Sequence, residues 1–188
     1  MQDPCRMIVR NGDKEETTMV DVPGKNELLT LQREQFTHDR RNHSDVVFLG
    51  KADRLKHYGL HFAKYVGRLV RAGEPISLER TVVDTVLVSL SAANTLSQNL
   101  GTLQLPDPAA GYLADRLVDL ADAAGRFADA CEKIDHLEPF LEQATQANLD
   151  ILAWSLRTAR IENFDITGSI AQRRAQLGQR AFFATQSI

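Results

Sequence analysis

The feature that most constrains the fold is a set of long segments whose apolar residues recur every three or four positions. In 53–71 this spacing is followed by Leu55, Gly59, Phe62, Val66 and Leu69. Such spacing places side chains on one face of a helix. Similar patterns cover four other segments, 26–36, 78–100, 111–134 and 141–163. Little of the chain alternates as a strand does, so the sequence predicts an all-α bundle of four to five main helices.

Breakers and polar stretches divide the chain into three expected parts. These are a flexible leader (1–25), a single all-α domain (26–164) and a short C-terminal helix or arm (165–188). The domain is expected to contain a first helix pair (26–100), a linker (101–110) and a second helix pair (111–164). Asn26 and Ser77 are predicted N-caps. The apolar run 46–49 is predicted to plug the connection between the first two helices.

Composition limits the classes of partner. The net charge is −3, so no global field attracts nucleic acid or an anionic membrane, and neither is expected as a partner. No run of about 18 apolar residues is present, which excludes a transmembrane helix by sequence. Cys5 and Cys131 are the two cysteines. Two distant cysteines favour reduced thiols, and we expect a cytoplasmic protein.

The chain contains an apparent internal repeat. Residues 63–74 and 121–132 share five of twelve positions, and they align Gly67-Arg68 with Gly125-Arg126. The helices that follow also align, as 83–90 against 149–156. A helix pair cannot bury its apolar face alone, so two pairs packed together are a natural solution. Chance similarity between two amphipathic helices is the alternative interpretation.

Residues 26–100 resemble the MazG-like all-α nucleoside triphosphate pyrophosphohydrolases. The resemblance rests on three segments: 28–36, 59–69 and 81–87. Lys64-Tyr65-Val66-Gly67-Arg68-Leu69 stands where this family carries Glu-Glu-Val-Gly-Glu-Leu, and Thr81-Val82-Val83-Asp84 stands where it carries Glu-x-x-Asp. The resemblance implies two MazG-like helix pairs and assembly as a homodimer.

The same resemblance implies a changed site. The family's carboxylates hold Mg²⁺, which prefers oxygen ligands. Here Lys64, Tyr65, Arg68 and Thr81 replace carboxylates, and only Asp84 is retained. We therefore expect a protein that binds a nucleotide or another phosphate-bearing ligand, or that has an interaction role. The alternative is an active (deoxy)nucleoside triphosphate pyrophosphohydrolase with a non-standard site, in which Asp84 is catalytic and Mg²⁺ or Mn²⁺ is the cofactor.

The second half offers a further candidate metal site. In the repeat alignment Lys64 corresponds to Asp122, Arg68 to Arg126, and Asp84 to Asp150. Asp122 and Asp150 therefore form a candidate carboxylate pair, and with Asp84 they are the predicted metal ligands. Arg126 is a predicted ligand-binding residue.

Basic residues follow one stripe of segment 53–71, namely Arg54, His57, His61, Lys64, Arg68 and Arg71. Spacings of three and four keep them on one helix face. Three interpretations remain open: a solvated face, a phosphate site that acts without metal, and a Zn²⁺ or Mn²⁺ site. The phosphate site would use Lys64, Arg68, His57 and His61. The metal site would use His57, His61 and Asp84.

Overall fold

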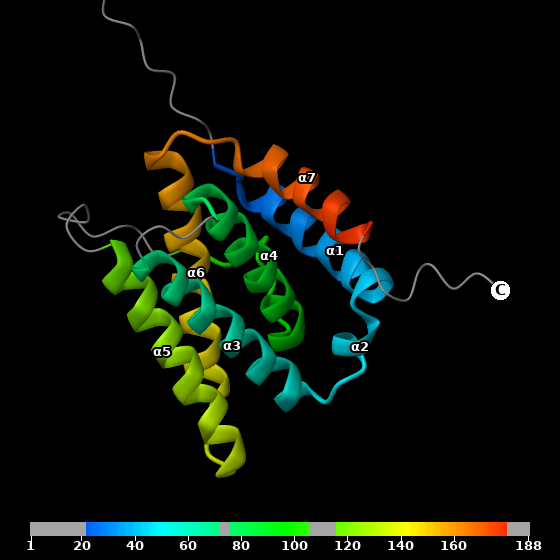
Figure 1. Ribbon diagram of the computed structural model, residues 1–188. Coiled ribbons are helices and arrows are strands. Elements are labelled where there is room, and N and C mark those ends of the chain that lie inside the picture. The colour runs from blue at the N-terminus through cyan, green and yellow to red at the C-terminus, as the bar shows by residue number, and fades with distance from the viewer. Residues whose placement is uncertain (1–21, 72–75, 106–115, 180–188) are drawn as a thin grey trace, which may run out of the picture.

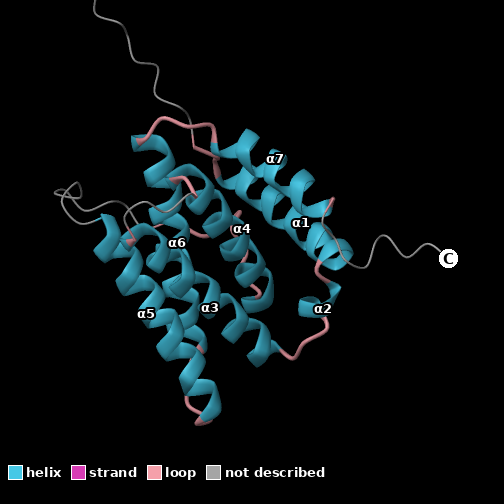
Figure 2. Ribbon diagram, viewed as in Figure 1, coloured by secondary structure: helices cyan, strands magenta, loops and turns pink. Residues whose placement is uncertain are grey.

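A computed structural model describes residues 22–71, 76–105 and 116–179, and within these ranges every regular element is a helix (Figure 2). The helices are α1 (Lys25–Asn42), α2 (Ser44–Val47), α3 (Lys51–Val70), α4 (Leu78–Leu96), α5 (Arg116–Asp135), α6 (Leu141–Ile161) and α7 (Ile166–Gly178). The predicted all-α fold is confirmed. None of the helices described is both long and apolar enough to cross a bilayer.

Helix α4 lies at the centre of the fold. Apolar and small residues occur on all its sides, and Val82, Val86 and Leu90 have no exposed surface. A helix that is apolar all round is stable only when other elements cover it. Helices α1, α3, α6 and α7 supply this cover. The helix begins as predicted, because the Ser77 side chain accepts a hydrogen bond from the Arg80 N–H (3.1 Å).

Four helices form the bundle, and two more lie over it. Helix α3 packs on α4 and α5, and α6 packs on the same two helices. The rings of Phe62 and Phe127 meet edge to face, 5.1 Å apart, and join α3 to α5. Helices α1 and α7 lie side by side against α4 (Figure 1). Trp154, predicted as a core residue, is buried in α6.

Several local predictions were wrong. Helix α1 begins at Lys25 with Gly24 as its N-cap, where the Gly24 N–H donates to Glu27 Oε2 (2.7 Å); Asn26 lies inside the helix. The predicted apolar plug forms only in part, because Val46 packs against the core whereas Phe48 is 86% exposed and Leu49 is 42% exposed. This segment instead contains the short helix α2. Helix α4 ends at Leu96, where Ser97 adopts a left-handed φ of 61°, and does not reach residue 100.

The tail contributes more to the fold than a terminal arm would. Helix α7 packs on α1 and α4, and its Ile166 and Ile170 are buried. Asp165 caps the helix by accepting a hydrogen bond from the Gly168 N–H (3.0 Å). Most of the predicted leader and half of the predicted linker lie outside the described residues, as do residues 180–188.

Candidate functional site

A cavity of about 350 Å³ opens between α3, α4, α1 and α7, and we call it the α3–α4 cavity. It brings together five of the predicted site residues, His57, His61, Lys64, Arg68 and Asp84. The first four come from one face of α3, as their spacing predicted, and Asp84 comes from the first half of α4. Arg54 and Arg71, the other members of the basic stripe, are not among the lining residues.

Asp84 is held by three guanidinium groups. Arg173 Nε donates to Asp84 Oδ1 at 2.6 Å, Arg68 Nη1 to Oδ2 at 3.3 Å, and Arg80 Nε to Oδ1 at 3.3 Å. The Asp84 side chain is only 10% exposed, and those of Arg68 and Arg173 are 16% and 11% exposed. One carboxylate therefore faces three cations, and this end of the cavity carries an excess of positive charge.

Lys64 adds a fourth cation near the cavity. Its Nζ lies 3.1 Å from His61 Nδ1, and that nitrogen also lies 3.0 Å from the Tyr65 hydroxyl. Lys64 and Arg68 both lie over the Tyr65 ring, at 5.0 and 5.3 Å from its centroid. The Tyr65 ring is thus in contact with both basic side chains.

Burial shifts the titration of these groups. Burial and the Lys64 ammonium lower the pKa of His61 to about 4, so its imidazole is neutral at pH 7. Burial also lowers the pKa of His57. Burial and the nearby Arg68 lower the pKa of Lys64. Burial raises the pKa of Tyr65, and the Asp84 carboxylate raises it further, so the phenol stays protonated.

The opposite end of the cavity is different in character. It is lined by Gln35 and Asp39 of α1, His43 at the end of that helix, and Asp45. Burial lowers the pKa of His43 below its usual value. The cavity is therefore polarised, with cations around Asp84 at one end and with carboxylates and imidazole at the other.

The predicted carboxylate pair of the second half, Asp122 and Asp150, also forms ion pairs with an arginine. Arg126 lies between Asp122 and Asp150, with N–O distances of 2.8 Å to both. These residues line a smaller hollow of about 190 Å³, together with Asp119, Ala153, Trp154 and Arg157. Five of these seven residues lie in the aligned segments of the repeat, and the counterpart of each lines the α3–α4 cavity. The Arg126–Asp150 ion pair joins α5 to α6 as Arg68–Asp84 joins α3 to α4.

Metal-ligating groups gather elsewhere than predicted. Among the described residues, the one group of at least three such side chains with donor atoms close enough for an ion is His38, Asp39 and His43. The predicted set of His57, His61 and Asp84 does not form such a group in the described part of the chain.

Two kinds of site residue escaped the sequence-based reasoning. Arg173 comes from α7, 89 positions after its partner Asp84. Asp39 and His43 come from the end of α1. The basic and amphipathic character of 165–188 was a signal for Arg173, because α7 needs a partner for its apolar face. Nothing local indicated that α4 would be this partner.

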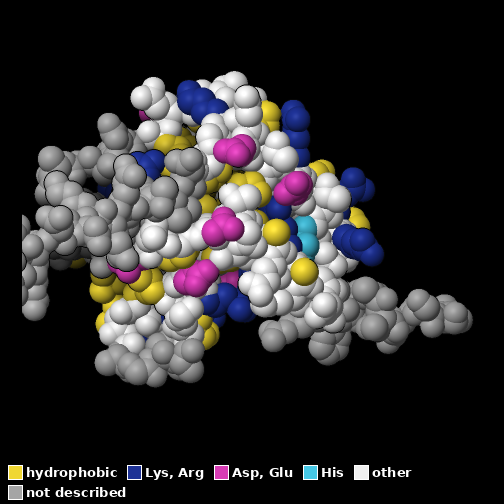
Figure 3. Space-filling view, turned by 90° about the horizontal axis from the view of Figure 1, so that it is seen from above, with side chains coloured by type: hydrophobic (Ala, Val, Ile, Leu, Met, Phe, Trp, Pro, Cys, Tyr) yellow, Lys and Arg dark blue, Asp and Glu magenta, His cyan; other side chains and the backbone are white. Residues whose placement is uncertain are grey.

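The surface shows no separation of charge on the face drawn in Figure 3, where basic and acidic side chains both occur with hydrophobic ones between them. This agrees with the near-neutral composition. Searches of protein-family models, curated proteins and solved structures found no match to this chain. Function is therefore inferred from the geometry of the cavity.

Proposed function

We propose that the α3–α4 cavity binds a small phosphate-bearing ligand, such as a nucleotide, without a metal at Asp84. The observation that carries the proposal is the set of three guanidinium groups around a single buried carboxylate, with Lys64 beside them. Guanidinium and ammonium groups are the usual protein donors to phosphate oxygens.

Unsatisfied donor capacity supports the proposal. Arg173 lines the cavity, and its Nη1 is buried without a hydrogen-bond partner. A buried donor without an acceptor is costly, by about 1–3 kcal/mol. A bound anion next to Arg173 would supply oxygen acceptors and would offset the excess positive charge.

The size and lining of the cavity suit a ligand that also has an apolar or ring portion. Its volume of about 350 Å³ is at the lower end of ligand sites, which run from about 300 to 1,000 Å³. Val46, Leu87 and Leu177 line it together with the rings of Tyr58 and Tyr65. A nucleoside monophosphate or diphosphate has this combination of charge and ring.

The alternative enzyme function requires Asp84 to hold Mg²⁺ or Mn²⁺. Its carboxylate is instead engaged by arginines on both oxygens, and nearby cations repel a metal ion. Binding without catalysis is therefore favoured. The interaction role, a homodimer and a cytoplasmic location remain expectations from the sequence.

A thermal-shift assay tests the proposal. The protein is melted in EDTA with inorganic phosphate, pyrophosphate, ADP or ATP, and with sodium chloride at matched ionic strength. A ligand at 100 times its Kd stabilises the folded state by about 2.7 kcal/mol. We expect at least one phosphate compound to raise Tm beyond the chloride control, and Lys64→Met and Arg68→Met to reduce that rise.

Arg126→Met is the matched control, because Arg126 makes the equivalent ion pair in the other helix pair. It should leave the ligand-induced rise unchanged. Equal stabilisation by phosphate and chloride would refute the proposal. Pyrophosphate release from ATP with Mg²⁺ or Mn²⁺, abolished by Asp84→Ala, would favour the enzyme. A mass that rises with concentration, without any ligand effect, would favour an interaction role.

A further inference from the structure

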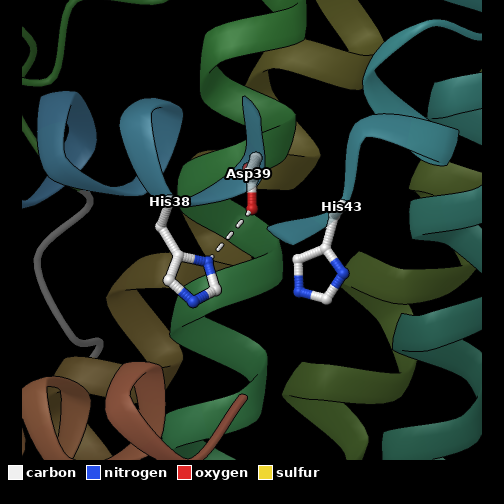
Figure 4. A group of neighbouring side chains, drawn as sticks. All are labelled: His38, Asp39 and His43. Carbon is white, nitrogen blue, oxygen red and sulfur yellow. Dashed lines mark ion pairs between the residues drawn. The ribbon is translucent and has the colours of Figure 1, made fainter. Parts of the chain in front are cut away.

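Two histidines and an aspartate meet where α1 ends. His38 and Asp39 belong to the last turns of α1, and His43 is the residue that follows the helix. One donor atom from each lies within 4.8 Å of the other two. The two imidazole rings flank the Asp39 carboxylate (Figure 4), and their centroids are 5.5 Å apart.

The tautomer of His38 follows from its hydrogen bond. His38 Nε2 lies 3.2 Å from the backbone carbonyl oxygen of Arg174. A carbonyl only accepts, so Nε2 carries the hydrogen, and Nδ1 of the neutral ring presents a lone pair. Histidine ligands of metals commonly donate their other N–H to a backbone carbonyl in this way.

Hydrogen bonds also fix the orientation of Asp39. Its Oδ1 accepts from Gln35 Nε2 (2.8 Å), and its Oδ2 accepts from Ser91 Oγ (2.5 Å). The Gln35 amide is oriented in turn, because its Oε1 accepts from Arg174 Nε (2.9 Å). Arg174 thus positions both His38 and Asp39, which is the kind of support that surrounds the ligands of a metal site.

One contact in the cluster lacks a bridging atom. His38 Nδ1 lies 3.8 Å from Asp39 Oδ1, which is too long for a hydrogen bond. Nδ1 is buried without a hydrogen-bond partner, and the His38 side chain is only 9% exposed. Two electron-pair donors therefore face each other in a buried place, and a cation between them would satisfy both.

We propose that His38, Asp39 and His43 bind one divalent transition-metal ion, such as Zn²⁺. Donor atoms within 4.8 Å of one another all lie within about 2.8 Å of a common point. Bonds of about 2.0–2.2 Å then require each donor to move inward by less than about 1 Å. Asp39 and His43 also line the α3–α4 cavity, so a fourth ligand would come from that side.

The donor set selects the class of ion. Two imidazole nitrogens and one carboxylate oxygen suit Zn²⁺, Co²⁺ or Mn²⁺, whereas Mg²⁺ and Ca²⁺ prefer sites made of oxygen. The three proposed ligands do not include Asp84 and the metal proposal does not rest on phosphate binding, although Asp39 and His43 line the same cavity as Asp84.

The test is a metal titration of the full chain, stripped with chelator and kept free of phosphate. Zn²⁺ binding is measured by calorimetry, and Co²⁺ binding by its visible absorption. We expect one ion per chain. His43→Gln and Asp39→Asn should each weaken binding by at least about 100-fold, and Gln35→Ala by about 10-fold. His136→Gln is the control, since that side chain is 64% exposed and directly follows the end of α5.

Circular dichroism of each variant without metal shows whether the fold is kept. His43→Gln is the decisive variant, because residue 43 lies just after α1 and its replacement leaves the residues of the helix unchanged. Binding that is equal in His43→Gln and His136→Gln would overturn the proposal. The proposal would also be overturned if His57→Gln lost metal binding while His43→Gln kept it. That result would place the ion at His57 and His61. Absence of any binding of Zn²⁺ or Co²⁺ would overturn the proposal as well.

Discussion

Replacing Asp84 by Asn should destabilise the fold far more than the equivalent change in the second half. Asp84 is 10% exposed and accepts from three arginines, two of which have side chains at most 16% exposed. Asn has nearly the same shape but no charge, so three guanidinium groups would lose their anion. Removing one partner from a buried ion pair costs about 3–5 kcal/mol. We take about 3 kcal/mol, the lower end of this range, because a cavity of about 350 Å³ has room for water beside the carboxylate.

Asp150→Asn is the matched control. Asp150 is 25% exposed and pairs with Arg126, which is 37% exposed and keeps Asp122 as a second partner. A pair this exposed contributes about 0.5–1 kcal/mol. The two variants thus test whether burial, and not the ion pair as such, makes Asp84 important.

Urea denaturation followed by circular dichroism measures both changes. With an m-value of about 2 kcal/mol/M, a loss of about 3 kcal/mol lowers the urea midpoint by about 1.5 M. Asp150→Asn should lower it by less than about 0.5 M. Phosphate should also stabilise Asp84→Asn more than wild type, because the anion would replace the missing carboxylate. Equal midpoints for the two variants would refute this reasoning.

Three further predictions concern titration, backbone and core. The folded-state pKa of His61 is about 4 against an ordinary 6.5, so the contribution of this side chain to stability is complete above pH 6.5 and is lost as pH falls toward 4. Between pH 7 and 5, wild type should lose about 2 kcal/mol more than His61→Gln in urea melts, and His136→Gln should match wild type. Gly125→Ala should stabilise the folded protein by about 0.5–1 kcal/mol in thermal melts, because an added Cβ meets nothing within 4 Å. Gly101→Ala should destabilise it, because its Cβ would lie 2.9 Å from Leu29 Cδ2. Asn148→Ala should lower the free energy of unfolding by about 2–3 kcal/mol, because this buried side chain forms hydrogen bonds with Ser89 and with Gln98 Oε1 (2.8 Å). Gln146→Ala, at an exposed position, should change it little. An unchanged stability in Asn148→Ala would contradict the assigned hydrogen bonds.

Local spacing predicted the part of the site that lies on one helix and its neighbour. His57, His61, Lys64 and Arg68 recur at intervals of three and four, so their shared face was readable from sequence. Asp84 was added from the resemblance to the MazG-like Glu-x-x-Asp segment, and it lies on the helix that follows α3. The structure brings all five to one cavity.

Long-range packing determined the rest. Arg173 reaches Asp84 only because α7 folds back across α4, and no periodicity in α4 shows this. The sequence also could not show that arginines would occupy Asp84 and Asp150, because each pairing depends on the rotamers of both partners. The wrong plug at 46–49 has a simpler cause: apolar residues were assumed to be buried, and Phe48 lies on a turn that no other element covers.

The most direct test of the phosphate-binding proposal is a crystal structure of the full chain soaked with tungstate, an anion of phosphate shape that is located by its anomalous scattering. The proposal predicts an anomalous peak in the α3–α4 cavity, within hydrogen-bond distance of Lys64, Arg68 or Arg173, and its loss in Lys64→Met/Arg68→Met. An empty cavity at saturating tungstate, or a peak only at the Arg126 hollow, would contradict it.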